Sequence, residues 1–346
     1  MVQTQTARSR VKDMLGRRLH DLRISVIDRC NLRCTYCMPA EDFHEHYEFL
    51  PDRDRLTFEE ITRITRLFVR LGVSKLRVTG GEPLLRKNLP VLIAMLQEIE
   101  GLEDLALTTN GLLLAQQARA LKDAGLRRVT VSLDTLDDAV FGRMNGRHVG
   151  TGAVLAGIQK AAEVGLVPIK INVVVQRGVN DDTVVVLAEH FKGKGHIVRF
   201  IEYMDVGTCN GWRYEHVVPS KDILARLREK HALIPLEENY HGEVAERYAY
   251  ADGGGEIGFI TSVTEPFCST CTRARISPDG KLYTCLFADA GTDLRDPLRS
   301  GATDEELLDL IRNVWAARKD RYSELRAEAS YAGNGRKKIE MYQIGG

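Results

Sequence analysis

The sequence has no apolar stretch long enough to cross a membrane, and no apolar leader with a small-residue cleavage site near its start. It also has no excess of charge, because 48 lysines and arginines balance 48 aspartates and glutamates. These absences argue against a membrane anchor, against secretion and against broad electrostatic attraction to nucleic acid. We therefore predict a cytoplasmic protein that binds neither membrane nor nucleic acid.

The seven cysteines are an odd number, which does not suit a framework of disulfides. Six of them fall into two tight groups that lie far apart in the chain. Grouped thiols of this kind indicate metal binding in a reducing compartment. For the seventh, Cys209, we predict only the role of a small buried hydrophobe or an inert thiol.

Short β-branched runs alternate with helical patterns through the first two thirds of the 346 residues. The predicted strands are 22–26, 75–79, 105–109, 129–133, 169–175 and 197–203. The predicted helices are 57–72, 88–100, 113–124, 151–164, 181–192 and 220–230. Six strand-then-helix units indicate a parallel sheet, which could be an open doubly wound sheet or an incomplete barrel.

This regular alternation ends near residue 235. Residues 239–290 are rich in glycine and short β-prone runs, which predicts a smaller α+β cap. A last helix should begin at Thr303, with Glu306 completing a capping box. We therefore predict three parts of the chain, listed in order: a flexible tail at 1–14, a barrel domain at 15–235 and a C-terminal domain at 236–346.

The first cysteine group follows the first predicted strand as Cys30, Cys34 and Cys37. Three thiolates can hold three irons of a [4Fe-4S] cluster and leave the fourth iron open. S-adenosylmethionine (SAM) can chelate that iron, and one electron then breaks a carbon-sulfur bond to release a 5'-deoxyadenosyl radical. Zinc is the alternative, but it prefers four protein ligands, and neither His44 nor His46 has finger-like spacing.

The C-x3-C-x2-C spacing resembles that of the radical SAM superfamily. The segment Thr79-Gly80-Gly81-Glu82-Pro83 ends the second predicted strand and looks like the GGEP motif of that superfamily, whose backbone receives the amino group of SAM. The resemblance implies an incomplete (βα)6 barrel of the TIM type. Polar residues at other strand ends, each an ordinary turn residue when taken alone, would then share one mouth. They are Thr108, Thr109, Asn110, Ser132, Asp134, Lys170, Asn172, Arg199, Glu202 and Met204.

The second cysteine group, Cys268, Cys271 and Cys285, again offers three thiolates with no fourth cysteine after them. This predicts a second cluster with an open iron, because a zinc ribbon would need another pair. Arg273 and Arg275 lie between these cysteines, would point to one side of an extended segment, and can bind phosphate oxygens in a bidentate way. With further basic residues near strand ends, they indicate a polyphosphate ligand: Arg23, Arg77, Lys170 and Arg199.

After residue 15 the sequence resembles the GTP 3',8-cyclase family, which acts first in molybdenum cofactor biosynthesis. The shared segments, beyond the first cysteines and GGEP, are 107–111, 131–134, 199–204, 268–275 and 281–287. The resemblance implies that the adenosyl radical takes hydrogen from C3' of GTP and that the carbon radical attacks C8. The product would be (8S)-3',8-cyclo-7,8-dihydroguanosine 5'-triphosphate.

The same resemblance assigns roles to individual residues. SAM would contact Tyr36, Gly81, Ser132 and Met204. GTP would contact Arg23, Arg77, Thr108, Lys170, Arg273, Ala274 and Arg275. Three of these would be catalytic: Arg23, Arg273 and Arg275. The guanine would bind the open iron of the second cluster, and the C-terminal Gly345-Gly346 pair would reach into the active site.

The partners implied by the resemblance are a reductant protein of the flavodoxin or ferredoxin type, a downstream cyclic pyranopterin monophosphate synthase, and a second copy of the chain in a homodimer. The competing interpretation is a radical SAM enzyme that modifies peptides or proteins and carries an auxiliary cluster. A more distant one is an iron-sulfur electron carrier or a zinc-binding module. Passive carriers normally have fully ligated clusters, which disfavours that class.

Overall fold

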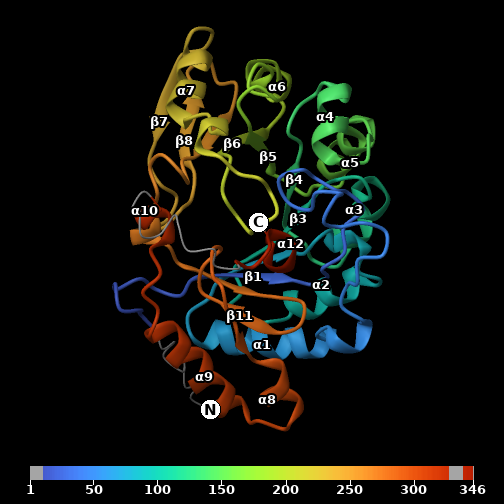
Figure 1. Cartoon of the computed structure of the whole chain (residues 1–346), viewed down its shortest axis with the longest axis vertical. Helices are drawn as coiled ribbons and strands as arrows, with labels where there is room; N and C mark the ends of the chain where they lie inside the picture. The colour runs from blue at the N-terminus through green and yellow to red at the C-terminus, as the bar shows by residue number, and fades with distance from the viewer. Residues whose placement is uncertain (1–10, 327–337, 346) are drawn as a thin grey trace.

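The computed structural model describes residues 11–326 and 338–345. Its centre is a parallel sheet in which six strands lie in chain order (Figure 1). These strands are β1 (Asp21–Ser25), β2 (Lys75–Thr79), β3 (Asp104–Thr109), β4 (Arg128–Ser132), β5 (Ile169–Val175) and β6 (His196–Glu202). The sheet ends in two different edge strands and does not close on itself, which confirms the prediction of an incomplete barrel.

Helices connect these strands and cover the outer face of the sheet (Figure 1). They are α1 (Phe58–Arg70), α2 (Leu89–Gln97), α3 (Leu114–Asp123), α4 (Asp138–Asn145), α5 (Gly152–Glu163), α6 (Val184–Phe191) and α7 (Ser220–Arg228). The predicted strands match within one residue at each end, and Thr57 and Glu60 form the capping box of α1. The sequence prediction missed α4, a short helix whose signal is a single N-cap, Asp137.

The C-terminal part does more than cap the barrel, because its strands extend the same sheet at both edges. The elements are β7 (Leu233–Leu236), β8 (Glu246–Tyr250), β9 (Glu256–Ile260), β10 (Arg273–Ile276), β11 (Lys281–Tyr283) and β12 (Thr292–Asp293). β10 pairs in parallel with β1, and β9 pairs in parallel with β6. An open barrel leaves unpaired backbone groups on its edge strands, and β9 and β10 supply their partners. The boundary predicted at residue 235 therefore does not separate two sheets.

Four further helices complete the described chain: α8 (Arg295–Arg299), α9 (Asp304–Ala316), α10 (Tyr322–Leu325) and α12 (Met341–Ile344). The short 3-10 segments are η1 (Asp52–Asp54), η2 (Pro83–Leu85), η3 (Tyr214–His216) and η4 (Cys268–Thr270). As predicted, α9 begins after Thr303, with Glu306 completing the capping box. It buries Leu307, Ile311 and Trp315 against the rest of the core.

The predicted flexible tail lies mostly outside the described residues, but its last residues are packed. Asp13 is buried, and its carboxylate accepts a hydrogen bond of 2.6 Å from Arg17 Nε and lies 3.5 Å from Arg318 Nη1. Two guanidinium groups compensate this charge, so it can be buried. Asp13, which the sequence predicts to belong to the tail, is therefore part of the folded chain.

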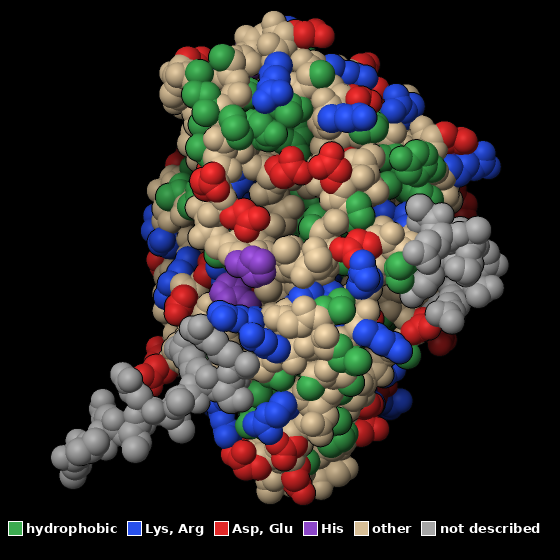
Figure 2. Space-filling view, turned by 90° about the vertical axis from the view of Figure 1, so that its left-hand side faces the viewer, with side chains coloured by type: hydrophobic (Ala, Val, Ile, Leu, Met, Phe, Trp, Pro, Cys, Tyr) green, Lys and Arg blue, Asp and Glu red, His purple; other side chains and the backbone are tan. Residues whose placement is uncertain are grey.

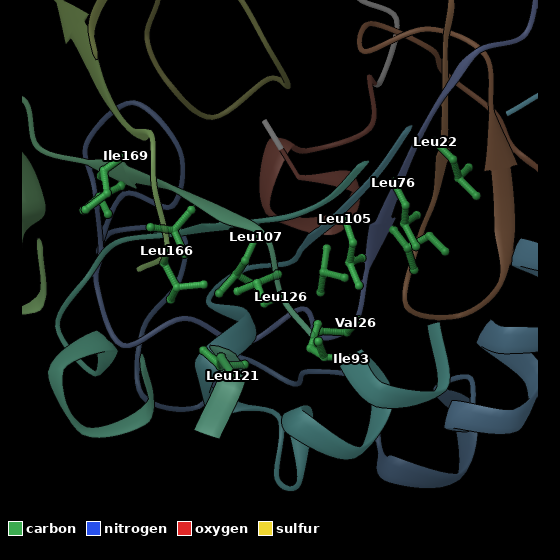
Figure 3. Close-up of a cluster of buried hydrophobic side chains, with 14 of the residues drawn as sticks. Leu22, Val26, Leu76, Ile93, Leu105, Leu107, Leu121, Leu126, Leu166 and Ile169 are labelled. Carbon is green, nitrogen blue, oxygen red and sulfur yellow. The ribbon is translucent and has the colours of Figure 1, made fainter. Parts of the chain in front are cut away.

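The main hydrophobic core lies between the strands and the outer helices. Leu22, Leu76 and Leu105 point from the strands toward the helix layer, where Ile93 and Leu121 meet them (Figure 3). Because side chains alternate along a strand, the residues next to these leucines must face the barrel interior. The buried apolar face thus fixes which polar residues line the site.

The outer surface carries charges of both signs in close alternation on the face seen in Figure 2, in keeping with the balanced composition. In the described part of the chain, no helix has both the length and the apolar character needed to span a bilayer.

Candidate active site

A row of three arginines lies across the interior face of the sheet. The strand register places Arg275 of β10 beside Arg23 of β1, and Arg23 beside Arg77 of β2. Their neighbours on each strand belong to the hydrophobic core, so the three side chains face the interior together. Like charges side by side are unfavourable unless an anion binds between them. The charge and position of the row therefore fit a polyanionic ligand.

The next row toward the start of the strands differs, because its charges alternate in sign. It runs in register through Arg273, Asp21, Lys75 and Asp104. Asp104 also accepts a hydrogen bond of 2.9 Å from Arg128 Nε. This row neutralises itself, so the uncompensated positive charge is confined to the row above it.

Burial without a counter-charge shifts the pKa values of the interior basic groups. Burial and the neighbouring Arg275 and Arg77 lower the pKa of Arg23 well below its usual value. Burial, with Arg199 nearby, lowers the pKa of Lys170 to about 7. Arg273 Nη1 and Arg275 Nε are buried and have no hydrogen-bond partner among the described residues. Unpartnered buried donors of this kind fit a ligand with several anionic oxygens.

Ala274, assigned to GTP by resemblance, lies between these two arginines but on the opposite face of β10. Its side chain is fully buried in the hydrophobic core. Any contact that Ala274 makes with a ligand must therefore come from its backbone. Thr108 does face the interior, and its Oγ1 lies 3.4 Å from Arg77 Nη1.

The first cysteine group lies in the loop after β1, at the mouth formed by the strand ends. The Sγ atom of Cys30 accepts a hydrogen bond of 3.4 Å from Leu32 N. Cys34 and Cys37 pack against the buried Tyr36 and Tyr203. Burial, and next the charge of Glu82, raises the pKa of Cys30 to about 11. The thiols are thus dry and close to one another, and metal binding would be needed to ionise them.

Gly80 and Gly81 let this loop approach β2 closely. A Cβ atom on Gly81 would lie 2.4 Å from the carbonyl oxygen of Arg29, and one on Gly80 would lie 2.6 Å from that of Ile27. The backbone of the loop also bonds directly to this turn, since Gly81 N donates to Ile27 O at 2.7 Å. The two glycines are therefore required for loop packing, in addition to any contact with SAM.

Three buried carboxylates hold the strand ends together. Glu82 accepts hydrogen bonds from Thr109 Oγ1 and Asn110 N, each 2.7 Å long, and burial raises its pKa to about 7. Asp134 accepts from Val174 N at 2.8 Å, and Glu202 accepts from Ser220 N at 2.9 Å. The sequence analysis grouped Asp134 and Glu202 with other strand-end polar residues, whereas the structure gives both a positioning role.

The residues assigned to SAM lie around the same mouth. Tyr36 donates a hydrogen bond of 2.7 Å from its hydroxyl to Asp134 Oδ2, which fixes the tyrosine beside the cysteines. Ser132 ends β4 and is half-buried, and Met204 lies just after β6, also half-buried. With Gly81, these positions surround the strand ends, where parallel βα folds place their ligands.

The C-terminal tail enters this mouth. Gly345 has φ +68°, and a Cβ atom there would lie 2.1 Å from Cγ2 of Thr79 at the end of β2. Tyr342 is buried, and its hydroxyl lies 2.6 Å from that of Tyr47. Gly346 lies outside the described residues. The structure therefore places the first glycine of the terminal pair at the strand ends.

The second cysteine group lies beside β10, at the edge of the sheet. Cys271 is buried, and Arg318 Nη2 lies 3.1 Å from its Sγ atom. Burial opposes ionisation of this thiol, but Arg273 and Arg318 outweigh it and lower the pKa of Cys271 to about 6. Cys285 differs, because burial and then Asp320 raise its pKa to about 12.

The residues that hold this second loop carry no signal in the sequence. Arg17 Nη1 donates to the carbonyl oxygen of Cys268 at 2.7 Å, and Arg318 Nη1 donates to that of Cys271 at 2.7 Å. Asp13 connects these two arginines. No local pattern marks them, because Asp13 and Arg318 are some 300 positions apart and meet only in the folded chain.

Neither cysteine group is arranged for a single ion. In residues 11–326 and 338–345, no three histidine, cysteine or acidic side chains converge on one ion position. A cubane cluster does not require this, because each thiolate binds a different iron. Three thiols with no fourth protein ligand fit such a cluster better than they fit tetrahedral zinc.

The partially buried Cys209 lies beside the first group, with its Sγ atom 3.1 Å from Glu340 Oε2. Burial, followed by Glu340, raises the pKa of Cys209 above its usual value. It packs against Met38 and Tyr342 but is only partly buried, and its role as a small hydrophobe or an inert thiol stays a prediction.

Two family models match consecutive parts of the chain. The family model of the radical SAM superfamily matches residues 24–191, and that of Molybdenum Cofactor Synthesis C matches residues 196–324. The fold and the site therefore define a radical SAM enzyme.

Three relatives named GTP 3',8-cyclase are similar to this chain over 97% of its length. One from Xanthomonas campestris pv. campestris is 55% identical and is covered over 97% of its own length. Those from Acidothermus cellulolyticus and Staphylococcus aureus are 53% and 50% identical, and 99% of each is covered. The chain belongs to the GTP 3',8-cyclase family.

Proposed function

We propose that this enzyme converts GTP into (8S)-3',8-cyclo-7,8-dihydroguanosine 5'-triphosphate, the first step of molybdenum cofactor biosynthesis. Two [4Fe-4S] clusters would be held by Cys30, Cys34 and Cys37 and by Cys268, Cys271 and Cys285. When bound, the first cluster and SAM supply the radical that removes hydrogen from C3' of the ribose. The chain's own residues bind the substrate, orient it and exclude water.

The observation that carries this proposal is the row Arg275, Arg23 and Arg77. It lies inside the barrel, between the two cysteine groups, and has no anionic neighbour in its own row. A triphosphate would compensate these charges and occupy the unpartnered donors of Arg273 and Arg275. With its phosphates held there, the purine would lie near the second group and the ribose toward the first.

The residues at the mouth would position SAM. Gly81 presents backbone beside the cysteine loop, and Ser132 and Met204 border the opening from β4 and β6. Tyr36 is fixed by Asp134 and closes one side. Gly345, seated against Thr79, would narrow the space between SAM and GTP.

We assign Arg23, Arg273 and Arg275 to the catalytic machinery, because Arg275 lies beside Arg23 in the strand register and Arg273 also adds its charge to the surroundings of Arg23. The further parts of the proposal are a flavodoxin- or ferredoxin-type reductant, transfer of the product to a cyclic pyranopterin monophosphate synthase, and a homodimer. Grouped cysteines also support a reducing, cytoplasmic location.

The test is an anaerobic assay of the reconstituted enzyme with SAM and dithionite. We expect GTP to stimulate formation of 5'-deoxyadenosine, with a cyclised nucleotide appearing in equal amount. If 5'-deoxyadenosine forms at the same rate with and without GTP, the substrate assignment is wrong and a peptide substrate becomes the better hypothesis.

A further inference from the structure

Arginines without a carboxylate partner gather in a second place, outside the barrel. In the described part of the chain, no carboxylate lies within ion-pair distance of Arg29, Arg33 or Arg147, and the guanidiniums of Arg29 and Arg33 both lie over the ring of Phe49. Arg29 and Arg147 are exposed. All three surround the loop that carries Cys30, and none belongs to the substrate row described above.

These arginines form one continuous surface, centred on Phe49. The guanidinium carbons of Arg29 and Arg33 lie 5.9 and 5.8 Å from the Phe49 ring centroid. Arg147 follows Gly146, whose backbone packs directly against Arg33, since a Cβ atom on Gly146 would lie 2.2 Å from the carbonyl oxygen of Arg33. We call the surface formed by Arg29, Arg33, Phe49 and Arg147 the arginine face.

The arginine face continues into a pocket of about 630 Å³ on its other side. Arg29, Arg55 and Arg86 line this pocket together with Lys87. Arg55 is buried, and its Nε atom has no partner among the described residues. Asp52 and Glu59 also border the pocket, but Asp52 is bound by Arg55, so positive charge is in excess.

The arginine face lies directly on the first cysteine loop. Arg33 Nη1 donates to the carbonyl oxygen of Cys30 at 2.9 Å, and Arg33 Nε donates to that of Phe43 at 2.8 Å. The ring of Phe49 and the buried guanidinium of Arg33 therefore connect the surface to the loop that carries Cys30. On the opposite side, Cys37 is covered by Tyr342 of the C-terminal tail.

We propose that the arginine face is the docking surface for an acidic protein that carries a low-potential one-electron group. This proposal rests on the proposed function, because it assumes that the first cysteine group holds a reducible cluster. One electron leaves the reduced carrier and enters the cluster, so the carrier is oxidised by one electron and no bond is made or broken. Charge complementarity at the rim would speed encounter and fix orientation.

The test uses the reconstituted enzyme with reduced flavodoxin as the probe. The variant carries Arg29→Glu with Arg147→Glu, two exposed positions outside the substrate and SAM sites. We expect the Kd for flavodoxin, measured by calorimetry, to rise at least tenfold. The rate of flavodoxin-driven 5'-deoxyadenosine formation at low flavodoxin should fall by a similar factor, while the dithionite-driven rate stays unchanged.

A matched control carries Arg66→Glu with Arg228→Glu, which changes net charge equally at exposed positions on α1 and α7. We expect its Kd for flavodoxin to stay within twofold of the wild-type value. Equal weakening in both double variants would overturn the proposal, as would a parallel fall in the dithionite-driven rate. Failure of the proposed function would show differently, as loss of GTP stimulation in the wild-type enzyme with dithionite.

Discussion

The two cysteine groups each contribute three thiols, but the protein supports them by different means. The first is a local loop of eight residues, held by close backbone packing against Gly80 and Gly81. The second is assembled from distant segments, with Arg17 and Arg318 bonded to its backbone. Burial dominates around Cys30 and raises its pKa to about 11, whereas arginines lower that of Cys271 to about 6.

This difference indicates a division of labour. The first loop lies among strand ends and buried carboxylates, where a positively charged ligand such as SAM is tolerated. The second lies next to the arginine row, where a polyanion is favoured. Each group therefore comes with the electrostatic surroundings that suit a different ligand.

The largest expected effect comes from removing one thiol from each group, which tests whether the two groups have different roles. Cys34→Ser should abolish both cleavage of SAM and cyclisation. Cys271→Ser should abolish cyclisation but retain SAM cleavage, with about four iron atoms left per chain instead of about eight. Iron analysis and chromatography of 5'-deoxyadenosine would check this, and normal cyclisation in Cys271→Ser would refute a substrate role for the second group.

The next largest effect concerns the support of the second loop. Arg318→Met removes the bonds to Cys271 and leaves part of the Asp13 charge uncompensated in the interior. Breaking a buried pair in this way costs about 3–5 kcal/mol, which urea unfolding of the iron-free protein would measure. Arg312→Met, at an exposed site on the neighbouring α9, is the control and should change stability by no more than about 0.5 kcal/mol. A loss below about 1 kcal/mol for Arg318→Met would mean that the loop does not depend on this contact.

A third prediction separates the ligands of the two groups. Arg273→Ala combined with Arg275→Ala removes charge-assisted bonds to phosphate, each contributing about 1.5–3 kcal/mol. The Kd for GTP should rise about 100-fold or more in calorimetry, and that for SAM should change little. Arg119→Ala with Arg312→Ala, two exposed arginines, serves as the control. Equal weakening of SAM and GTP binding would contradict the division between the groups.

The smallest expected effect tests whether the phosphate-binding surface extends from the arginines near the second loop to Lys170. Lys170, on β5, has a pKa lowered to about 7, and a bound triphosphate should restore its protonated form. Below pH 7 the lysine is charged with and without ligand, so GTP affinity is constant. As pH rises through 7, binding must take up a proton, and affinity should fall about fivefold between pH 7 and pH 8.

The check is calorimetry in buffers of different ionisation enthalpy, which counts the proton directly. Lys170→Arg stays charged throughout this range and should remove the pH dependence. If the affinity of the wild-type enzyme is flat from pH 7 to pH 8, Lys170 does not contact the phosphates.

Much of this molecule could be predicted from short-range patterns. The β-branched runs located the strands within a residue, because alternation along a strand is a local property. The capping boxes at Thr57 and Thr303 located two helix starts for the same reason. The cysteine spacing predicted two cluster sites, because most of the proposed ligands of each group lie close together in the sequence.

Other features could not be predicted in this way. The helix α4 is too short to show a clear helical repeat of apolar residues. The packing of Asp13 depends on Arg318, which lies far along the chain. The sequence also grouped Asp134 with ligand candidates, whereas its hydrogen bonds to Tyr36 and Val174 give it a positioning role. Such roles depend on what faces a side chain, and local spacing carries no information about that.

The sequence by itself predicted the kind of chemistry. The signals were two groups of three cysteines, each without a fourth cysteine ligand, and the glycine turn after the second strand. Tertiary structure decided the substrate surface. Strand register sets Arg275, Arg23 and Arg77 in one row, and joining β9 and β10 to the barrel edges completes the interior. Register and edge pairing form between segments that are far apart in the chain, from β1 with β2 to β1 with β10, so they are fixed by long-range backbone hydrogen bonding and by burial of the apolar face.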